Sequence, residues 1–159
     1  MQPDSGDRDR VQFPGLGTTY LVRSEDTDGR FALVEHDIPP RKLAAPLHRH
    51  EREDEYSYVL EGQVGVQIGD DVRVAGPGEF VPKPRHIWHA FWNAGDEPAR
   101  LLELISPGGF ERYFAELEPH LNREGGPDFE QMGAIRARYG LEMDVESMGR
   151  LIERHNLEP

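Results

Sequence analysis

The chain has 159 residues, enough for one domain with a sizeable core, although its 36% apolar content is low for a globular protein. Its net charge of −12 argues against a nucleic-acid or anionic-membrane surface, because both need a basic patch. The absence of cysteine excludes disulfides and thiolate metal ligands. No apolar run approaches membrane-spanning length, and the N-terminus lacks the apolar stretch of a signal peptide. We therefore expect a cytoplasmic protein.

Short extended segments, separated by glycine, proline and aspartate turns, fill the chain up to residue 106. Residues 1–17 before them are expected to form a flexible arm. Strands are predicted at residues 18–23, 31–38, 43–50, 56–60, 64–68, 72–75, 79–82, 87–92 and 100–105. No internal repeat is evident. This rhythm predicts a single all-β sandwich or barrel over residues 18–106.

Helical spacing follows the barrel, over residues 107–159. Apolar residues recur at helical intervals in the first segment: Phe110, Tyr113, Phe114 and Leu117. Pro119 is expected to end that helix. Asp128 is a candidate N-cap for a second helix that ends at Gly140, and Asp144 can cap a third. We expect about three short helices that pack on the barrel or over its mouth.

Helix–turn–helix spacing in this extension would also be compatible with DNA binding. Residues 107–159 contain 6 basic and 11 acidic side chains, a net charge of about −5. Because phosphate contacts need the opposite balance, we interpret these segments as packing helices.

The stretch from Pro46 to Gly62 carries the first chemical signal. His48 and His50 are two residues apart in a predicted strand, so their imidazoles project from the same face. Glu55 follows a short acidic turn and opens the next strand. A solvated, charge-rich turn is the alternative interpretation, but His89 in a second segment about forty residues on favours a metal site. The neighbouring carboxylates Glu51, Glu53 and Asp54 are expected to be exposed.

Together the two segments resemble the cupin superfamily. The two motifs carrying the resemblance are His48-x-His50-x4-Glu55-x6-Gly62 and Gly78-x5-Pro84-x4-His89-x3-Asn93. The resemblance covers about residues 30–105. Within the superfamily, the sequence is similar to small, single-domain, quercetinase-like cupins. It implies a jelly-roll barrel, an architecture that hosts many different chemistries.

The resemblance also implies one divalent metal held by His48, His50, Glu55 and His89. Three imidazoles and one carboxylate suit Fe, Mn, Ni, Zn or Cu, and they leave coordination positions open for substrate, dioxygen or water. Two positions depart from the family pattern. Lys42 and His86 stand where cupins usually carry glycine, which puts the turn geometry near the barrel mouth in question. His86 is either a pocket residue or a turn residue facing solvent.

Strand alternation sorts the residues around His89. If His89 points inward, Ile87 and Phe91 do too, whereas Trp88 and Trp92 face outward. Exposed tryptophans need cover, either from the C-terminal helices or from a second subunit. A homodimer is the simpler expectation.

The same alternation places Ser57 and Val59 on the inner face of their strand. Glu35, His36 and Gln67 are further candidate lining residues, although the intervening turns leave their direction open and each is alternatively a surface residue. The expected pocket is mostly apolar. Arg41, Lys42 and Lys83 are possible contacts at its rim but form no phosphate-binding cluster, and this favours a small aromatic or enolic substrate over a phosphosugar.

The three-histidine, one-glutamate set with an apolar lining resembles that of small dioxygenase-type cupins. The resemblance implies a dioxygenase-type oxidoreductase, in which Glu55 would act both as a ligand and as the catalytic base. One alternative is a non-oxidative isomerase or polyketide-cyclase-type enzyme that uses Zn as a Lewis acid. Another is a cupin that binds a small molecule without turnover. The residues leave all three open.

Overall fold

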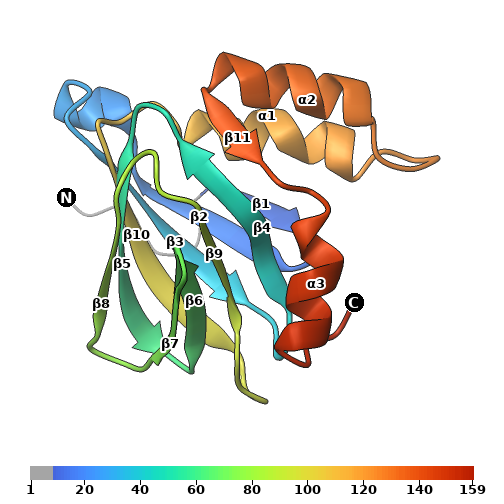
Figure 1. The fold of residues 1–159 in the computed structure, drawn as a ribbon. Coiled ribbons are helices and arrows are strands. Elements are labelled where there is room, and N and C mark those ends of the chain that lie inside the picture. Colours follow the sequence, from blue (N-terminus) through green and yellow to red (C-terminus); the bar gives the residue numbers. More distant parts are fainter. Residues whose placement is uncertain (1–8) are drawn as a thin grey trace.

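The computed structural model describes residues 9–159 and contains two antiparallel sheets that enclose a shared core (Figure 1). The first sheet has six strands, in spatial order β1 (Arg10–Phe13), β2 (Leu16–Val22), β3 (Ala32–Ile38), β10 (Ala99–Ser106), β5 (Asp54–Glu61) and β8 (Phe80–Lys83). The second sheet has five, in the order β11 (Leu141–Met143), β4 (Leu43–His50), β9 (His89–Asn93), β6 (Val64–Ile68) and β7 (Asp71–Ala75). The all-β jelly-roll prediction is confirmed.

Side chains of successive residues alternate between the core and the outside, as expected for strands with one buried face. The buried set on β10 is Ala99, Leu101, Glu103 and Ile105, and the buried set on β3 is Ala32, Val34, His36 and Ile38. Apolar residues dominate both sets, and each contains one polar residue. These polar residues lie where the candidate site forms.

The flexible arm expected over residues 1–17 is wrong for residues 10–17. This segment forms β1 and the start of β2, which pair as an antiparallel hairpin. Val11 and Phe13 are buried, and the Phe13 ring lies 6.4 Å from that of Phe114 in the helical extension. The arm is ordered because its alternating apolar residues gain this cover. Residues 1–8 of the expected arm lie outside the described residues.

Three helices follow the strands, as predicted: α1 (Arg112–Leu121), α2 (Phe129–Arg138) and α3 (Ser147–Arg154). The prediction that Pro119 ends the first helix is wrong, because Pro119 is exposed and α1 continues to Leu121 beyond it. Asp128 caps α2 by accepting a hydrogen bond from Gln131 N at 3.1 Å. A 3-10 helix, η1 (Ser24–Thr27), links β2 to β3. Among the described residues, no helix is long and apolar enough to cross a membrane.

The strand β11 was not predicted. It is three residues long, lies between α2 and α3, and pairs with β4 at the edge of the second sheet (Figure 1). Asp144, predicted to cap α3, accepts a hydrogen bond from Ser147 N at 3.2 Å in the turn before the helix, whereas the N-cap position itself is Glu146. The extension is therefore hydrogen-bonded to the barrel as well as packed on it.

Trp92 is covered by α3. Its indole is 2% exposed and stacks on His155, with ring centroids 4.0 Å apart. A small cluster with Leu151 completes the cover. Gly65 lets the indole approach, because a Cβ there would lie 2.0 Å from Trp92 Nε1. The helices thus supply the cover that Trp92 was expected to need, and Trp88 is half-buried with the Arg49 guanidinium 4.9 Å from its ring centre. The homodimer and the cytoplasmic location stay predictions.

Candidate metal centre

Four buried side chains from three strands converge at one end of the barrel. His48 and His50 lie at the end of β4, Glu55 at the start of β5 and His89 at the start of β9. His48 and His89 are register partners, and the turn after β4 carries the chain to the other sheet, where Glu55 faces back. One ligand atom from each residue lies within 4.8 Å of the other three. The structure thus brings together all four predicted ligands in a group that could hold a metal ion.

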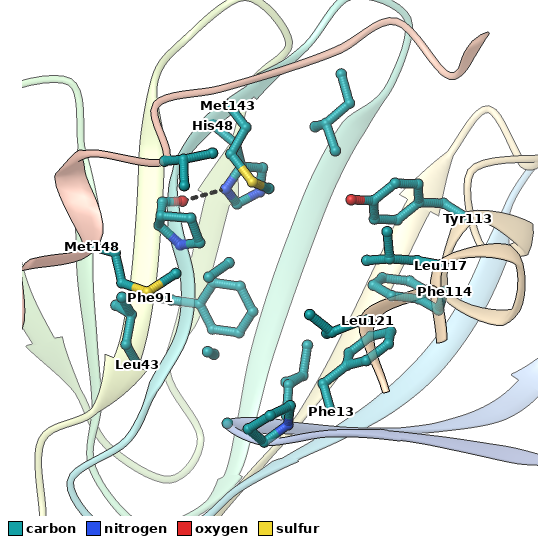
Figure 2. A pocket seen from close by; sticks show the side chains of 18 of the residues that line it. Phe13, Leu43, His48, Phe91, Tyr113, Phe114, Leu117, Leu121, Met143 and Met148 are labelled. Carbon is teal, nitrogen blue, oxygen red and sulfur yellow. Dashed lines mark hydrogen bonds between the residues drawn. The ribbon is translucent and has the colours of Figure 1, made fainter. Parts of the chain in front are cut away.

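The environment of each ring turns its Nε2 toward the centre. Nδ1 of His48 donates to the Pro46 carbonyl at 2.8 Å (Figure 2), and Nδ1 of His89 donates to the Ile87 carbonyl at 3.1 Å. Nδ1 of His50 lies 3.5 Å from a Glu53 carboxylate oxygen. Contacts of this kind fix the tautomer of metal-binding histidines and leave the Nε2 lone pair free.

Nε2 of His50 and of His89 each lies 3.3 Å from Glu55 Oε2, and neither has a hydrogen-bond partner among the described residues. Unpartnered buried nitrogens are costly, so they need an explanation. Three imidazole nitrogens and one carboxylate oxygen are a donor set that a divalent transition-metal ion satisfies. The group therefore fits such an ion, without selecting one element.

Burial and neighbouring charges shift the pKa values of the candidate ligands in different directions. Burial lowers the pKa of His48 well below its ordinary value, and the neighbouring imidazoles lower it further. Burial also lowers the pKa of His50, but Glu55 and Glu53 outweigh it and raise this pKa to about 9. Burial raises the pKa of Glu55, whereas His50 and Lys83 lower it more strongly, so the carboxyl group ionises well below its usual range. Glu55 is thus held as a carboxylate.

The acidic turn before Glu55 is only partly as predicted. Glu53, expected to be exposed, is 6% exposed because the turn folds it back against His50. Asp54 is half-buried and pairs with Arg85 at 3.0 Å, and Glu51 is exposed. Glu53 therefore faces a candidate ligand, at a distance longer than a hydrogen bond, whereas Glu51 and Asp54 do not.

A second buried polar group, Lys83 and Glu103, lies beside the ligands: the expected rim position of Lys83 is wrong, because Lys83 is 1% exposed, and sequence reasoning missed Glu103. Lys83 is the register partner of Glu55, and its Nζ lies 2.6 Å from Glu103 Oε1 and 3.6 Å from Glu55 Oε2. Ser57 Oγ donates to Glu103 Oε2 at 2.5 Å. Burial raises the pKa of Glu103 to about 7; Lys83 opposes this rise and Glu55 adds to it. The alternation Leu101, Glu103, Ile105 was the available signal, since it places a carboxylate on a buried face.

A cavity of about 500 Å³ extends outward from the ligand group. His48, Glu55, Lys83 and Glu103 line it together with many apolar side chains. Figure 2 shows Phe91, Leu43, Met143 and Met148 on the same side of the cavity as His48 and, on the opposite side, side chains from β1 and α1: Phe13, Tyr113, Phe114, Leu117 and Leu121. Barrel and extension therefore share the wall.

Two of the candidate lining residues border this cavity. Phe91 lies near the ligands, and His36 lies on the wall with its Nδ1 2.9 Å from Thr18 Oγ1. Burial lowers the pKa of His36 to about 4; Lys83 lowers it further and Glu55 opposes the shift. Ser57 and Val59 are buried on the inner face, as expected, but lie outside the lining: Ser57 holds Glu103 and Val59 packs in the core.

The other candidates lie elsewhere. The prediction that Ile87 points inward is wrong, because β9 begins at His89 and Ile87, in the preceding turn, is 40% exposed. Gln67 donates to the Gly69 carbonyl at 3.0 Å, outside the lining. Glu35 pairs with Arg100 at 2.9 Å on the outer face.

His86 is exposed in a turn and does not reach the cavity. Its φ of 67° is the left-handed conformation that glycine adopts without strain, which explains the usual glycine at this position. Its backbone N donates to the His50 carbonyl at 2.8 Å, so this turn supports the strand that carries two candidate ligands.

A family model for the cupin domain matches residues 34–105. The solved structure of the polyketide cyclase RemF from Streptomyces resistomycificus is 30% identical, with a TM-score of 0.56, and the match covers 67% of this chain and 78% of that one. The chain belongs to the cupin superfamily. The structure of KdgF from Halomonas sp. matches with a TM-score of 0.61 at 20% identity, over 69% of this cupin and 94% of that chain, which shows a shared fold alone.

A quercetin 2,3-dioxygenase of Bacillus subtilis (strain 168) is 26% identical to this cupin over 114 residues. The match covers 72% of this chain but 33% of the dioxygenase, so the chain spans about one third of that relative's length.

Proposed function

We propose that this cupin is a metal-dependent, dioxygenase-type oxidoreductase that acts on a small aromatic or enolic molecule. The observation that carries the proposal is that two members of the ligand group His48, His50, Glu55 and His89, namely His48 and Glu55, line a largely apolar cavity. The similarity to a quercetin 2,3-dioxygenase supports it. Because that match spans a third of the relative, the activity is our proposal for this chain.

A bound metal ion would supply open coordination positions for substrate and dioxygen. Glu55 would accept the proton from the substrate hydroxyl. Its pKa is held low by His50 and Lys83 against the opposing effect of burial, so it is a weak base. A carboxylate of this kind could take the proton of an enol or phenol whose acidity the metal ion would raise.

The cavity wall supports an apolar substrate body. Side chains of Phe13, Phe91, Phe114 and Leu117 lie around the space beyond the ligands (Figure 2). A volume of about 500 Å³ is within the range of small-molecule pockets, which is roughly 300–1,000 Å³. Such a wall excludes water from the reacting groups and strengthens the electrostatic interactions between them.

The test is oxygen uptake by Fe-, Mn-, Ni- and Cu-loaded protein incubated aerobically with flavonols and catechols. Uptake with at least one metal is expected, and it should be lost in His89→Ala. His120→Ala, which removes an imidazole on α1 outside the cavity, is the matched control and should retain uptake. Absence of uptake with every metal would rule out the oxygenase.

A second candidate is a non-oxidative enzyme of the isomerase or polyketide-cyclase type that uses zinc. The observation favouring it is the 30% identity to RemF, whose structure is described as that of a polyketide cyclase. Elemental analysis of natively purified protein separates the two candidates. Zinc without a redox-active ion, together with no oxygen uptake, would favour the cyclase type; iron, manganese, nickel or copper would count against it.

A further inference from the structure

The most unusual feature beyond the candidate ligands is the lysine at the inner end of the cavity. The chain has 16 arginines but two lysines, and one of these, Lys83, is 1% exposed. It borders the cavity, and its Nζ lies 4.7 Å from the centre of the Phe91 ring. A buried ammonium is costly unless it is paired, so its partners decide what it can do.

Three neighbouring strands fix the position of this ammonium. Lys83 on β8 lies opposite Glu55 on β5, and Ser57, also on β5, lies opposite Glu103 on β10. Ser57 and Lys83 both contact the Glu103 carboxylate, so Glu103 is held from two sides. Backbone registers within one sheet set these contacts, and the ammonium is therefore preorganised.

The two carboxylates do not use all the hydrogen-bonding capacity of the ammonium. Lys83 has three N–H donors, and its ion pair with Glu103, at 2.6 Å, engages at most one of them. Glu55 lies at 3.6 Å, beyond hydrogen-bond length, and it is one of the four candidate metal ligands. Donors therefore remain for an acceptor in the cavity that Lys83 borders.

The charges at this end of the cavity favour an anion as that acceptor. The Lys83 amine lies 2.6 Å from the Glu103 carboxylate, and an amine held in such an ion pair is protonated at ordinary pH. With a divalent ion on the ligand group, the two carboxylates that line the cavity bring at most two negative charges against three positive ones, and the third buried carboxylate, Glu53, lies behind His50 and outside the lining. An anionic oxygen would reduce this excess.

We infer that the Lys83 ammonium is a second anchor for the substrate, which binds an anionic oxygen, that of an ionised phenol or enol, beside the metal ligands. This inference rests on the proposed function for the kind of molecule that enters. It adds a protein group that selects the ionised form. Lys83 thus determines which substrates bind, and Glu103 positions it.

Binding of 4-nitrocatechol to zinc-loaded protein tests the inference, because the visible spectrum of this probe reports its ionisation and zinc supports no oxidation. Wild-type protein should bind the ionised probe. Lys83→Met should weaken binding about ten- to a hundredfold, the usual range for losing a hydrogen bond to a charged group, and should lower the ionised fraction of bound probe near pH 6.

Two controls isolate the charge. The neutral dimethyl ether of the probe should bind wild type and Lys83→Met within about twofold of each other. Arg154→Met removes an exposed cation on α3 that lies outside the cavity lining, and it should retain wild-type affinity. Because Lys83→Met alone leaves Glu103 unpaired, the double variant Lys83→Met/Glu103→Gln removes both charges and is measured in parallel.

The inference would be overturned if zinc-loaded Lys83→Met bound 4-nitrocatechol with wild-type affinity and with the wild-type ionised fraction. It would also be overturned by loss of zinc binding in both variants, because Lys83 would then serve the metal ligands and not the substrate. Lysine-dependent binding without oxygen uptake would leave the anchor standing and refute the oxygenase. Oxygen uptake with lysine-independent binding would refute the anchor alone.

Discussion

Replacement of His36 by Gln should remove a defined part of the acid sensitivity of this cupin. His36 is 2% exposed, and burial, reinforced by Lys83 and opposed by Glu55, lowers its pKa from 6.5 to about 4. The folded chain therefore binds fewer protons than the unfolded chain between these two values. Stability from His36 is fully present above pH 6.5 and is lost as the pH falls toward 4.

The two pKa values give the size of the effect. The folded state loses about 2 kcal/mol relative to the unfolded state on going from pH 7.5 to pH 5, and about 3 kcal/mol on going to pH 4. His36→Gln keeps a polar side chain near Thr18 but cannot titrate. Its own loss of stability between pH 7.5 and pH 5 should be smaller than that of wild type by about 2 kcal/mol.

The assay is urea unfolding of both proteins at pH 7.5 and pH 5, in EDTA so that metal binding does not change with pH. Comparing the two pH-dependent differences cancels every other titrating group that the proteins share. A general destabilisation by the substitution appears equally at both pH values and also cancels. Identical pH dependence in the two proteins would show that His36 is not buried in its neutral form, and would refute the reasoning.

Three other outcomes follow from the packing and from the ligand group. Leu151→Ala should lower the free energy of unfolding by about 3 kcal/mol, because Leu151 packs on the tryptophan of β9. Glu153→Ala, on the exposed side of α3, should change it by less than about 0.5 kcal/mol. Thermal melting measures both, and equal shifts in melting temperature would contradict this packing. Gly62→Ala should lower the free energy of unfolding by roughly 1 kcal/mol or more beyond the effect of Gly29→Ala. Both glycines have positive φ, but a Cβ at Gly62 would lie 2.8 Å from the backbone of β10, whereas a Cβ at Gly29 would have no atom within 4 Å. Zinc at about a thousand times its dissociation constant should stabilise wild type by about 4 kcal/mol and His48→Ala by much less, measured by thermal melting with EDTA as the reversal.

The candidate ligands could be predicted from the sequence because local geometry fixes most of them. A spacing of two places His48 and His50 on one face of a strand whatever the rest of the chain does. Each strand was also marked by its own alternation and by flanking turns. The Ile87 prediction was wrong because side chains alternate between inward and outward only inside a strand. Ile87 lies two residues before β9 begins.

Lys83 and Glu103 could not be placed together from the sequence, because their contact depends on the register of three strands. Each residue alternates with buried apolar neighbours, so either one could have been recognised as inward-facing. Their distance of 2.6 Å depends on β5 lying between β8 and β10, a long-range arrangement that no local pattern specifies. The strand β11 escaped for a related reason. Three residues show no period, and pairing with β4 is what makes them a strand.

The pairing of β11 with β4 connects the C-terminal extension to the strand that carries two of the candidate ligands. Without β11, β4 would be an edge strand of the second sheet, with unpaired backbone groups beside His48 and His50. Leu141 and Met143 of β11 instead pair with those two residues and line the cavity, and α1 supplies the opposite wall (Figure 2). The barrel thus sets the candidate ligands, and the extension completes the space beside them. Because the family model ends at residue 105, similarity to other cupins bears on the ligand group more than on the cavity wall that the extension supplies.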